Sequence, residues 1–141
     1  MSSSPKIYYT PAQVGVASFL GSALAGGWLV SRTYKAAGHH NAASTSLSIG
    51  VLVTASLISM ALFGPEWFPV RLMGFAITFG WFQFSKSCQG TLVEHLHVEG
   101  AAKAPWWKAI LAGVISLIVV LTAIFAVVYF TPGEAFVDYV E

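Results

Sequence analysis

Four histidines and one cysteine are the side chains best suited to chemistry in this chain. Imidazole and thiolate groups are good ligands for zinc, copper or nickel, and Glu94 and Glu99 could add oxygen atoms. No established metal-ligand spacing is present, and two adjacent histidines rarely bind one ion. The sequence therefore favours solvated loop histidines, with a transition-metal site as the alternative. These residues are His39, His40, Cys88, His95 and His97.

A second group of residues has the composition of a lipid contact. Arg32, Tyr34 and Lys35 stand just before Gly38, directly after a long apolar run. A basic, aromatic segment beside a membrane helix commonly contacts anionic headgroups. We expect these side chains to anchor the protein at the membrane surface and to take no part in catalysis.

Catalytic motifs are lacking in the sequence. It holds no nucleotide-binding loop, no Ser-His-Asp set and no paired carboxylates in an apolar run. The residue types therefore predict no catalytic residue and a protein that is not an enzyme. No cofactor is expected beyond the alternative transition metal. The net charge of +1 gives no reason to expect a nucleic-acid partner.

The composition indicates a membrane protein. Of the 141 residues, 56% are hydrophobic and 9% are charged, and the mean hydropathy is +0.71. A soluble domain carries roughly 25% charged residues. A chain with so few charges cannot cover a water-facing surface, so much of its surface must lie against lipid.

Long uncharged stretches predict four membrane-spanning helices in one domain, residues 1–141. A span needs about 20 apolar residues. The third stretch is shorter, but Arg71 and Lys86 at its ends can extend toward the headgroups. The fold class is thus an all-α polytopic membrane protein, a four-helix transmembrane bundle with short loops. The predicted spans are residues 11–31, 43–63, 69–88 and 107–130, with a helical extension over 89–105 in a loop.

The short turn from Gly64 to Phe68 makes the second and third spans antiparallel neighbours. Basic residues predict the orientation, because they accumulate on the cytoplasmic side. The two longer loops hold five of them, and the opposite side holds two basic residues and four of the six acids. We expect both loops in the cytoplasm and both termini outside. The five are Arg32, Lys35, Lys86, Lys103 and Lys108, the two are Lys6 and Arg71, and the acids are Glu66, Glu134, Asp138 and Glu141.

Small residues recur at a spacing of four in the first and third spans, which places each set on one helical face. Helices in lipid associate by such close packing. The residues can serve packing within one bundle, or packing against a second copy or another membrane subunit. They are Ala17, Gly21 and Ala25, Ser18, Ser22 and Gly26, and Ala76 with Gly80.

The opening of the chain supports a bacterial origin by resemblance. The stretch YTPAQVGVASFLGSALAGGWLV, residues 9–30, followed by RTYKAAG, residues 32–38, is similar to the start of some small bacterial inner-membrane proteins of unknown function. The resemblance covers a quarter of the chain and implies no activity. Size and span number also resemble the MAPEG glutathione-metabolism enzymes. Their second helix is rich in Arg, Asn and Glu, whereas residues 43–63 have no charge and no Asn, which excludes that family.

Three functions remain open. The preferred hypothesis is an accessory or assembly subunit, or a homo-oligomeric scaffold, in the bacterial inner membrane, because packing surface is abundant and chemical motifs are lacking. The second is an oligomeric channel or small-molecule transporter, lined by polar residues of the middle spans. The third is a transition-metal-binding membrane protein. The polar residues of the second hypothesis are Thr54, Ser59, Thr78 and Gln83.

Overall fold

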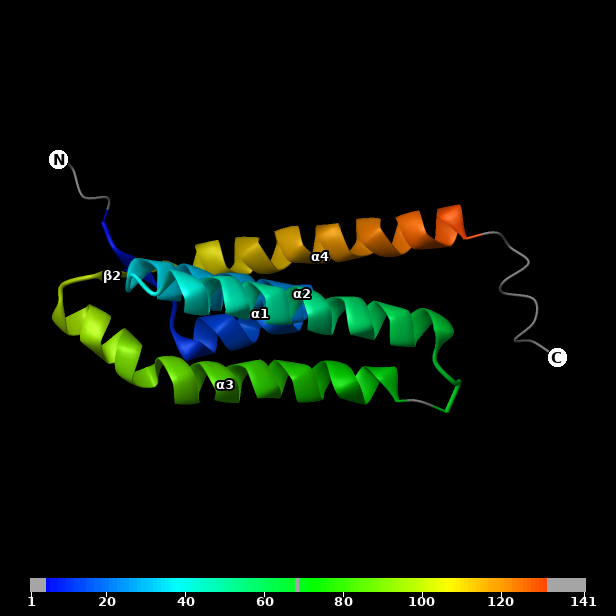
Figure 1. Ribbon diagram of the computed structural model, residues 1–141, viewed down its shortest axis with the longest axis horizontal. Helices are drawn as coiled ribbons and strands as arrows, with labels where there is room; N and C mark the ends of the chain where they lie inside the picture. Colours follow the sequence, from blue (N-terminus) through cyan, green and yellow to red (C-terminus); the bar gives the residue numbers. More distant parts are fainter. Residues whose placement is uncertain (1–4, 68, 132–141) are drawn as a thin grey trace.

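The computed structural model describes residues 5–67 and 69–131, and four long helices make up most of this part of the chain (Figure 1). In the view of Figure 1, α3 and α4 flank the pair formed by α1 and α2. Two short strands lie near the loop between α3 and α4. The elements are β1 (Ile7–Tyr8), α1 (Pro11–Ala36), α2 (His40–Phe63), α3 (Val70–Val98), β2 (Ala102–Lys103) and α4 (Trp106–Phe130).

The helix α1 reverses its direction halfway along its length. Gly21 and Ser22 have non-helical backbone angles, and Ser22 has a φ of 67°. The N–H of Tyr9, just before the helix, donates a hydrogen bond to Thr33 Oγ1 near its end, over 3.1 Å. In an uninterrupted helix these positions would be about 36 Å apart. Residues 11–20 and 23–36 therefore form two antiparallel arms, called here the first and second arm.

Small side chains allow the two arms to lie against each other. Ser18 is on the first arm and Gly26 is on the second, and a Cβ atom at Gly26 would collide with Ser18 Oγ. The Ser18 hydroxyl instead donates to the carbonyl of Val14, over 2.8 Å. Thr10 begins the first arm as an N-cap, and Gln13 completes a capping box with it.

α1 is the centre of the bundle, because α2, α3 and α4 each pack extensively on it while α2 and α3 barely touch each other. The closest approaches again use glycine. A Cβ at Gly27 would lie 2.8 Å from the carbonyl oxygen of Ser46 in α2 and 3.0 Å from Gly50 Cα. On the other side, a Cβ at Gly113 in α4 would lie 3.2 Å from the carbonyl oxygen of Ala17.

Three sequence predictions need correction. One uninterrupted helix over residues 11–31 is wrong, because the chain turns back at Gly21–Ser22. The second and third spans run antiparallel as predicted, but α1 fills the space between them. Residues 5–10 were predicted on the side opposite the loops, and they lie beside the α3–α4 loop, where β1 pairs with β2 in parallel. Glu134, Asp138 and Glu141 lie outside the described residues.

Within the described residues, three helices are long and apolar enough to cross a membrane, judged by length and composition: Pro11–Ala36, which the reversal divides into two arms, His40–Phe63 and Trp106–Phe130. α3 is not among them, although it spans 29 residues. α3 runs past Cys88 to Val98, and the part after Cys88 carries Glu94, His95 and His97, whereas Arg71 and Lys86 lie before it. The outward faces of α2, α3 and α4 expose many large apolar side chains, which is consistent with a membrane protein.

Candidate functional site

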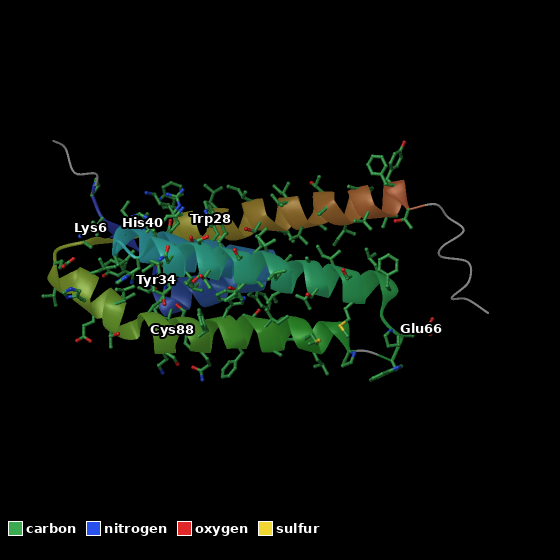
Figure 2. All side chains as sticks on the ribbon, viewed as in Figure 1. Lys6, Trp28, Tyr34, His40, Glu66 and Cys88 are labelled. Atoms are coloured by element: carbon green, nitrogen blue, oxygen red, sulfur yellow. The ribbon has the colours of Figure 1, made fainter. Side chains whose placement is uncertain are left out.

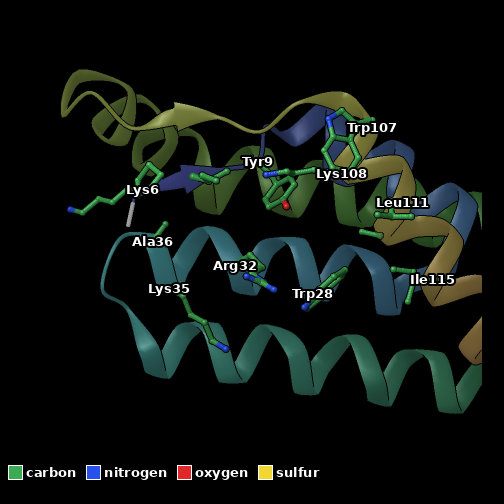
Figure 3. Close-up of a pocket in the computed structure, with 13 residues that line it drawn as sticks. Lys6, Tyr9, Trp28, Arg32, Lys35, Ala36, Trp107, Lys108, Leu111 and Ile115 are labelled. Carbon is green, nitrogen blue, oxygen red and sulfur yellow. The ribbon is translucent and has the colours of Figure 1, made fainter. Parts of the chain in front are cut away.

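A cavity of about 720 Å³ opens at the end of the bundle where the loops lie (Figure 3). Its walls come from the chain before α1, from the second arm of α1 and from the first turns of α4. We call it the basic cavity, because four of its lining side chains are cationic and none is acidic. It is lined by Pro5, Lys6, Ile7, Tyr9, Trp28, Arg32, Lys35, Ala36, Trp107, Lys108, Leu111, Ala112 and Ile115.

Hydrogen bonds hold residues 5–10, here named the N-terminal strap, over this cavity. The N–H of Ala102 donates to the carbonyl of Lys6, and the N–H of Ala104 donates to the carbonyl of Tyr8, each over 2.9 Å. Gln13 strengthens the junction, because its Nε2 donates to the carbonyl of Ala104 over 2.7 Å in a fully buried position. The strap is thus tied to both α1 and the α3–α4 loop.

The charges around the cavity are not balanced. Lys6 Nζ lies 3.5 Å from Glu99 Oε2, in an exposed ion pair. Arg32, Lys35 and Lys108 have no carboxylate partner among the residues that the structure describes. Glu66 is far away, at the opposite end of the bundle (Figure 2). The cavity therefore carries excess positive charge beside apolar walls.

Aromatic rings accompany two of these cations. The guanidinium carbon of Arg32 lies 5.4 Å from the ring centre of Trp28, and Lys108 Nζ lies 5.7 Å from that of Trp107. Such cation–π contacts hold the charged groups near the cavity. Indole rings also favour the boundary between headgroups and hydrocarbon. The arrangement can receive an anion next to an apolar chain.

The structure divides the predicted headgroup contact. Arg32 and Lys35 line the basic cavity, whereas Tyr34 lines a different hollow of about 380 Å³. Sequence reasoning missed Lys6, Trp107 and Lys108 as part of the same site. Lys6 was missed because the predicted crossing of residues 11–31 carried it to the other side. The small-residue run around Gly21–Ser22 permits the reversal but does not by itself predict it.

The metal candidates are only partly brought together. His39, Cys88 and His95 line the hollow that also contains Tyr34. His97 is directed elsewhere, with Nδ1 3.1 Å from the hydroxyl oxygen of Tyr8, and His40 is exposed without lining that hollow. Within residues 5–67 and 69–131, no three His, Cys, Asp or Glu side chains are close enough to hold a metal ion.

The predicted packing residues have two different environments. The six small residues of α1 are buried apart from Ser22, which is partly exposed and lies with its hydroxyl 3.4 Å from that of Thr54. The six are Ala17, Ser18, Gly21, Ser22, Ala25 and Gly26. Ala76 and Gly80 are exposed on α3, and a Cβ at Gly80 would meet nothing within 4 Å. They line an apolar groove of about 310 Å³ between α2 and α3, named here the lateral groove. It is formed by Ile49, Val53, Ala76, Ile77, Gly80, Trp81 and Phe84.

Comparison of the chain with models of protein families, with curated proteins and with solved structures found no match. The function of the chain is therefore inferred from the arrangement of its own residues.

Proposed function

We propose that this protein is a non-catalytic accessory or assembly subunit of the bacterial inner membrane, which binds another transmembrane helix in its lateral groove. The observation that supports this most directly is the exposure of Ala76 and Gly80. Small residues exposed on a membrane helix let a partner backbone approach closely. The partner is either a second copy of the chain or a different membrane subunit.

The proposal includes a membrane arrangement. α2, α3 and α4 cross the bilayer, while the two arms of α1 enter from one face and return to it. Both loops and the N-terminal strap then share one side, on which Lys6, Arg32, Lys35, Lys103 and Lys108 gather. The positive-inside rule makes this side cytoplasmic. At the tip of α1, Gly21 is buried and Ser22 is partly buried, and non-helical backbone at membrane depth requires such cover by protein.

The contacts at the reversal of α1 are compatible with this membrane arrangement. The tip residues Gly21 and Ser22 contact α4 and α2 through Gly113 and Thr54. The Thr54 hydroxyl also donates to the carbonyl of Gly50, over 2.8 Å. Polar groups near the middle of the bundle are therefore paired inside the protein, which makes insertion of the hairpin energetically acceptable.

The other two functions have less support. Channel-lining residues should face one path, but Ser59 and Gln83 are exposed, and the Thr78 hydroxyl donates to the carbonyl of Gly74 in its own helix, over 2.9 Å. A metal site would draw on His39, Cys88 and His95, which share a hollow without close grouping. A metal ion could bind there only if these side chains moved closer together.

Crosslinking in native membranes tests the proposal. Cys88→Ala removes the single native thiol, and Gly80→Cys then places a thiol in the lateral groove without a clash. Ile118→Cys is the matched control, because Ile118 is exposed on α4, outside the lateral groove. We expect oxidation or a short bifunctional reagent to link Gly80→Cys to one defined species. Equal, diffuse crosslinking from both positions, or none from either, would overturn the proposal.

A further inference from the structure

We propose that the basic cavity binds one molecule of an anionic phospholipid, with its phosphate between Arg32 and Lys108 and one chain along α4. This goes beyond the proposed subunit function, because it concerns the opposite side of α1 and α4 and requires no protein partner. It also differs from general headgroup contact, because a walled cavity holds one molecule in one orientation.

The charges identify the headgroup. Three cationic side chains that have no carboxylate partner among the described residues line the cavity, and they come from two helices that are distant in sequence. Arg32 and Lys35 lie on the second arm of α1, and Lys108 lies in the first turn of α4. Gathering like charges is unfavourable unless an anion compensates them. A phosphate accepts several such hydrogen bonds at once, and arginine is well shaped to donate two of them.

The walls identify the rest of the ligand. Leu111 and Ile115 continue the cavity along α4, one turn apart, and both are partly exposed at 47% and 45%. Ala112 lies between them in sequence, and its small side chain leaves space in the cavity. A hydrocarbon chain that follows these residues removes apolar surface from water, while the headgroup remains at the charged end. Free phosphate has no apolar group that could pack against this half of the cavity.

Aromatic residues place the cavity at the correct depth. Trp28 and Trp107 stand beside the two cations that would hold the phosphate. Tryptophan is enriched at the boundary between headgroups and hydrocarbon, which is also where a phospholipid changes from polar to apolar. The volume of about 720 Å³ accommodates a headgroup and the upper part of one chain.

The N-terminal strap completes the site. Pro5, Ile7 and Tyr9 form the side of the cavity away from the second arm. Lys6 is paired with Glu99, so the phosphate would be bound by the other cations. Because the strap is held by backbone hydrogen bonds on β2, the cavity exists before any lipid binds. A preformed site needs little ordering on binding, which favours retention of a single lipid.

Native mass spectrometry of the full-length protein tests this site. The protein is released from nanodiscs that contain equal parts of phosphatidylglycerol and phosphatidylcholine, and retained lipids are identified. We expect one retained phosphatidylglycerol. Arg32→Gln combined with Lys108→Gln should lower its retention about 25-fold, at about fivefold for each removed charge. The matched control, Lys86→Gln with Lys103→Gln, removes the same charge outside the cavity and should retain the lipid.

A steric variant tests the chain. Leu111→Trp fills the apolar half without changing charge, and Leu121→Trp is the control on the outer face of α4. Only Leu111→Trp should reduce retention, and glycerol 3-phosphate should not displace the lipid. Circular dichroism and size exclusion confirm that the variants fold. If the charge variant fails to fold, the comparison of Leu111→Trp with Leu121→Trp still tests whether the lipid binds in the cavity.

Three results would overturn the inference. The first is equal retention of both lipids by the unaltered protein. The second is equal loss in the cavity variant and in the Lys86, Lys103 control, which would indicate general charge attraction. The third is undiminished retention in Leu111→Trp, or displacement by glycerol 3-phosphate, which would make the occupant a free phosphate. Crosslinking at Gly80 is independent of all three results.

Discussion

The N–H of Tyr9 donates to the hydroxyl of Thr33 over 3.1 Å, and that hydroxyl donates in turn to the carbonyl of Leu29, over 3.2 Å. This chain of two bonds joins the beginning of α1 to its end, although 24 residues separate Tyr9 from Thr33. The bond requires the reversal at Gly21–Ser22. It also sets the N-terminal strap beside the loops, where Lys6 can reach the basic cavity. The fold and the site therefore depend on the same reversal.

The position of the strap is the first prediction. With Cys88→Ala as background, we introduce Lys6→Cys, Gly38→Cys and Glu66→Cys one at a time. A membrane-impermeant maleimide should label positions 6 and 38 from the same side of sealed vesicles, and position 66 from the other. The reason is that residue 6 is bonded to the α3–α4 loop, whereas Glu66 lies at the far end. Labelling of position 6 together with position 66 would contradict the hairpin.

The backbone of Ser22 gives a second prediction. Its φ of 67° and ψ of −174° lie in a region that essentially only glycine adopts, at a cost of about 1–3 kcal/mol. Its hydroxyl contact with Thr54 stabilises the fold by about 0.6 kcal/mol, the average for such bonds between membrane helices. Ser22→Gly should therefore raise the free energy of unfolding by about 1 kcal/mol.

Thermal or denaturant unfolding in detergent measures this change. Ser22→Ala is the control, because it loses the hydroxyl and keeps the backbone strain, so it should be less stable than the unaltered protein. A Ser22→Gly variant that is less stable than Ser22→Ala would show that Ser22 does not carry this backbone strain.

The contact between Gly27 and Gly50 gives a third prediction. A methyl group at Gly27 would lie 2.8 Å from a carbonyl oxygen and 3.0 Å from Gly50 Cα, so backbone atoms must move. Gly27→Ala should lower the free energy of unfolding by about 1–3 kcal/mol, as overpacking does. Gly90→Ala, where a Cβ meets nothing within 4 Å, should instead raise it by up to about 1 kcal/mol through helix propensity. Equal effects in the two variants would refute close packing of α1 on α2.

The buried amide of Gln89 gives a fourth prediction. Its Oε1 accepts from the Ser85 hydroxyl over 2.9 Å, and its Nε2 donates to the carbonyl of Val30 over 3.1 Å. Gln89→Leu removes both bonds and leaves Ser85 without this acceptor in a buried position. We expect a loss of about 1–2 kcal/mol in unfolding free energy, measured in detergent. Gln83→Leu alters an exposed amide on the same helix and should be nearly neutral; a larger effect there would contradict the assignment of faces.

The sequence alone determined where most helices begin and end. α2 ends at Phe63 and α4 ends at Phe130, as predicted, because Gly64–Pro65 and the end of the apolar run are local signals. Proline likewise marks the starts of α3 and α4 at Pro69 and Pro105 to within a residue. Residue type alone also marked the basic, aromatic segment with Arg32 and Lys35, and headgroup contact at this segment stays a prediction.

Only the tertiary structure decided that α1 turns back and that Lys108 joins Arg32 in one cavity. An apolar run of 26 residues has the same composition whether it forms one long helix or two short arms. The small side chains around Gly21–Ser22 permit either, so hydropathy cannot distinguish them. The choice follows from the three-sided packing of α2, α3 and α4 on the arms and from the strap's hydrogen bonds, which join residues far apart in sequence. These packing and hydrogen-bond energies arise only when the helices are assembled.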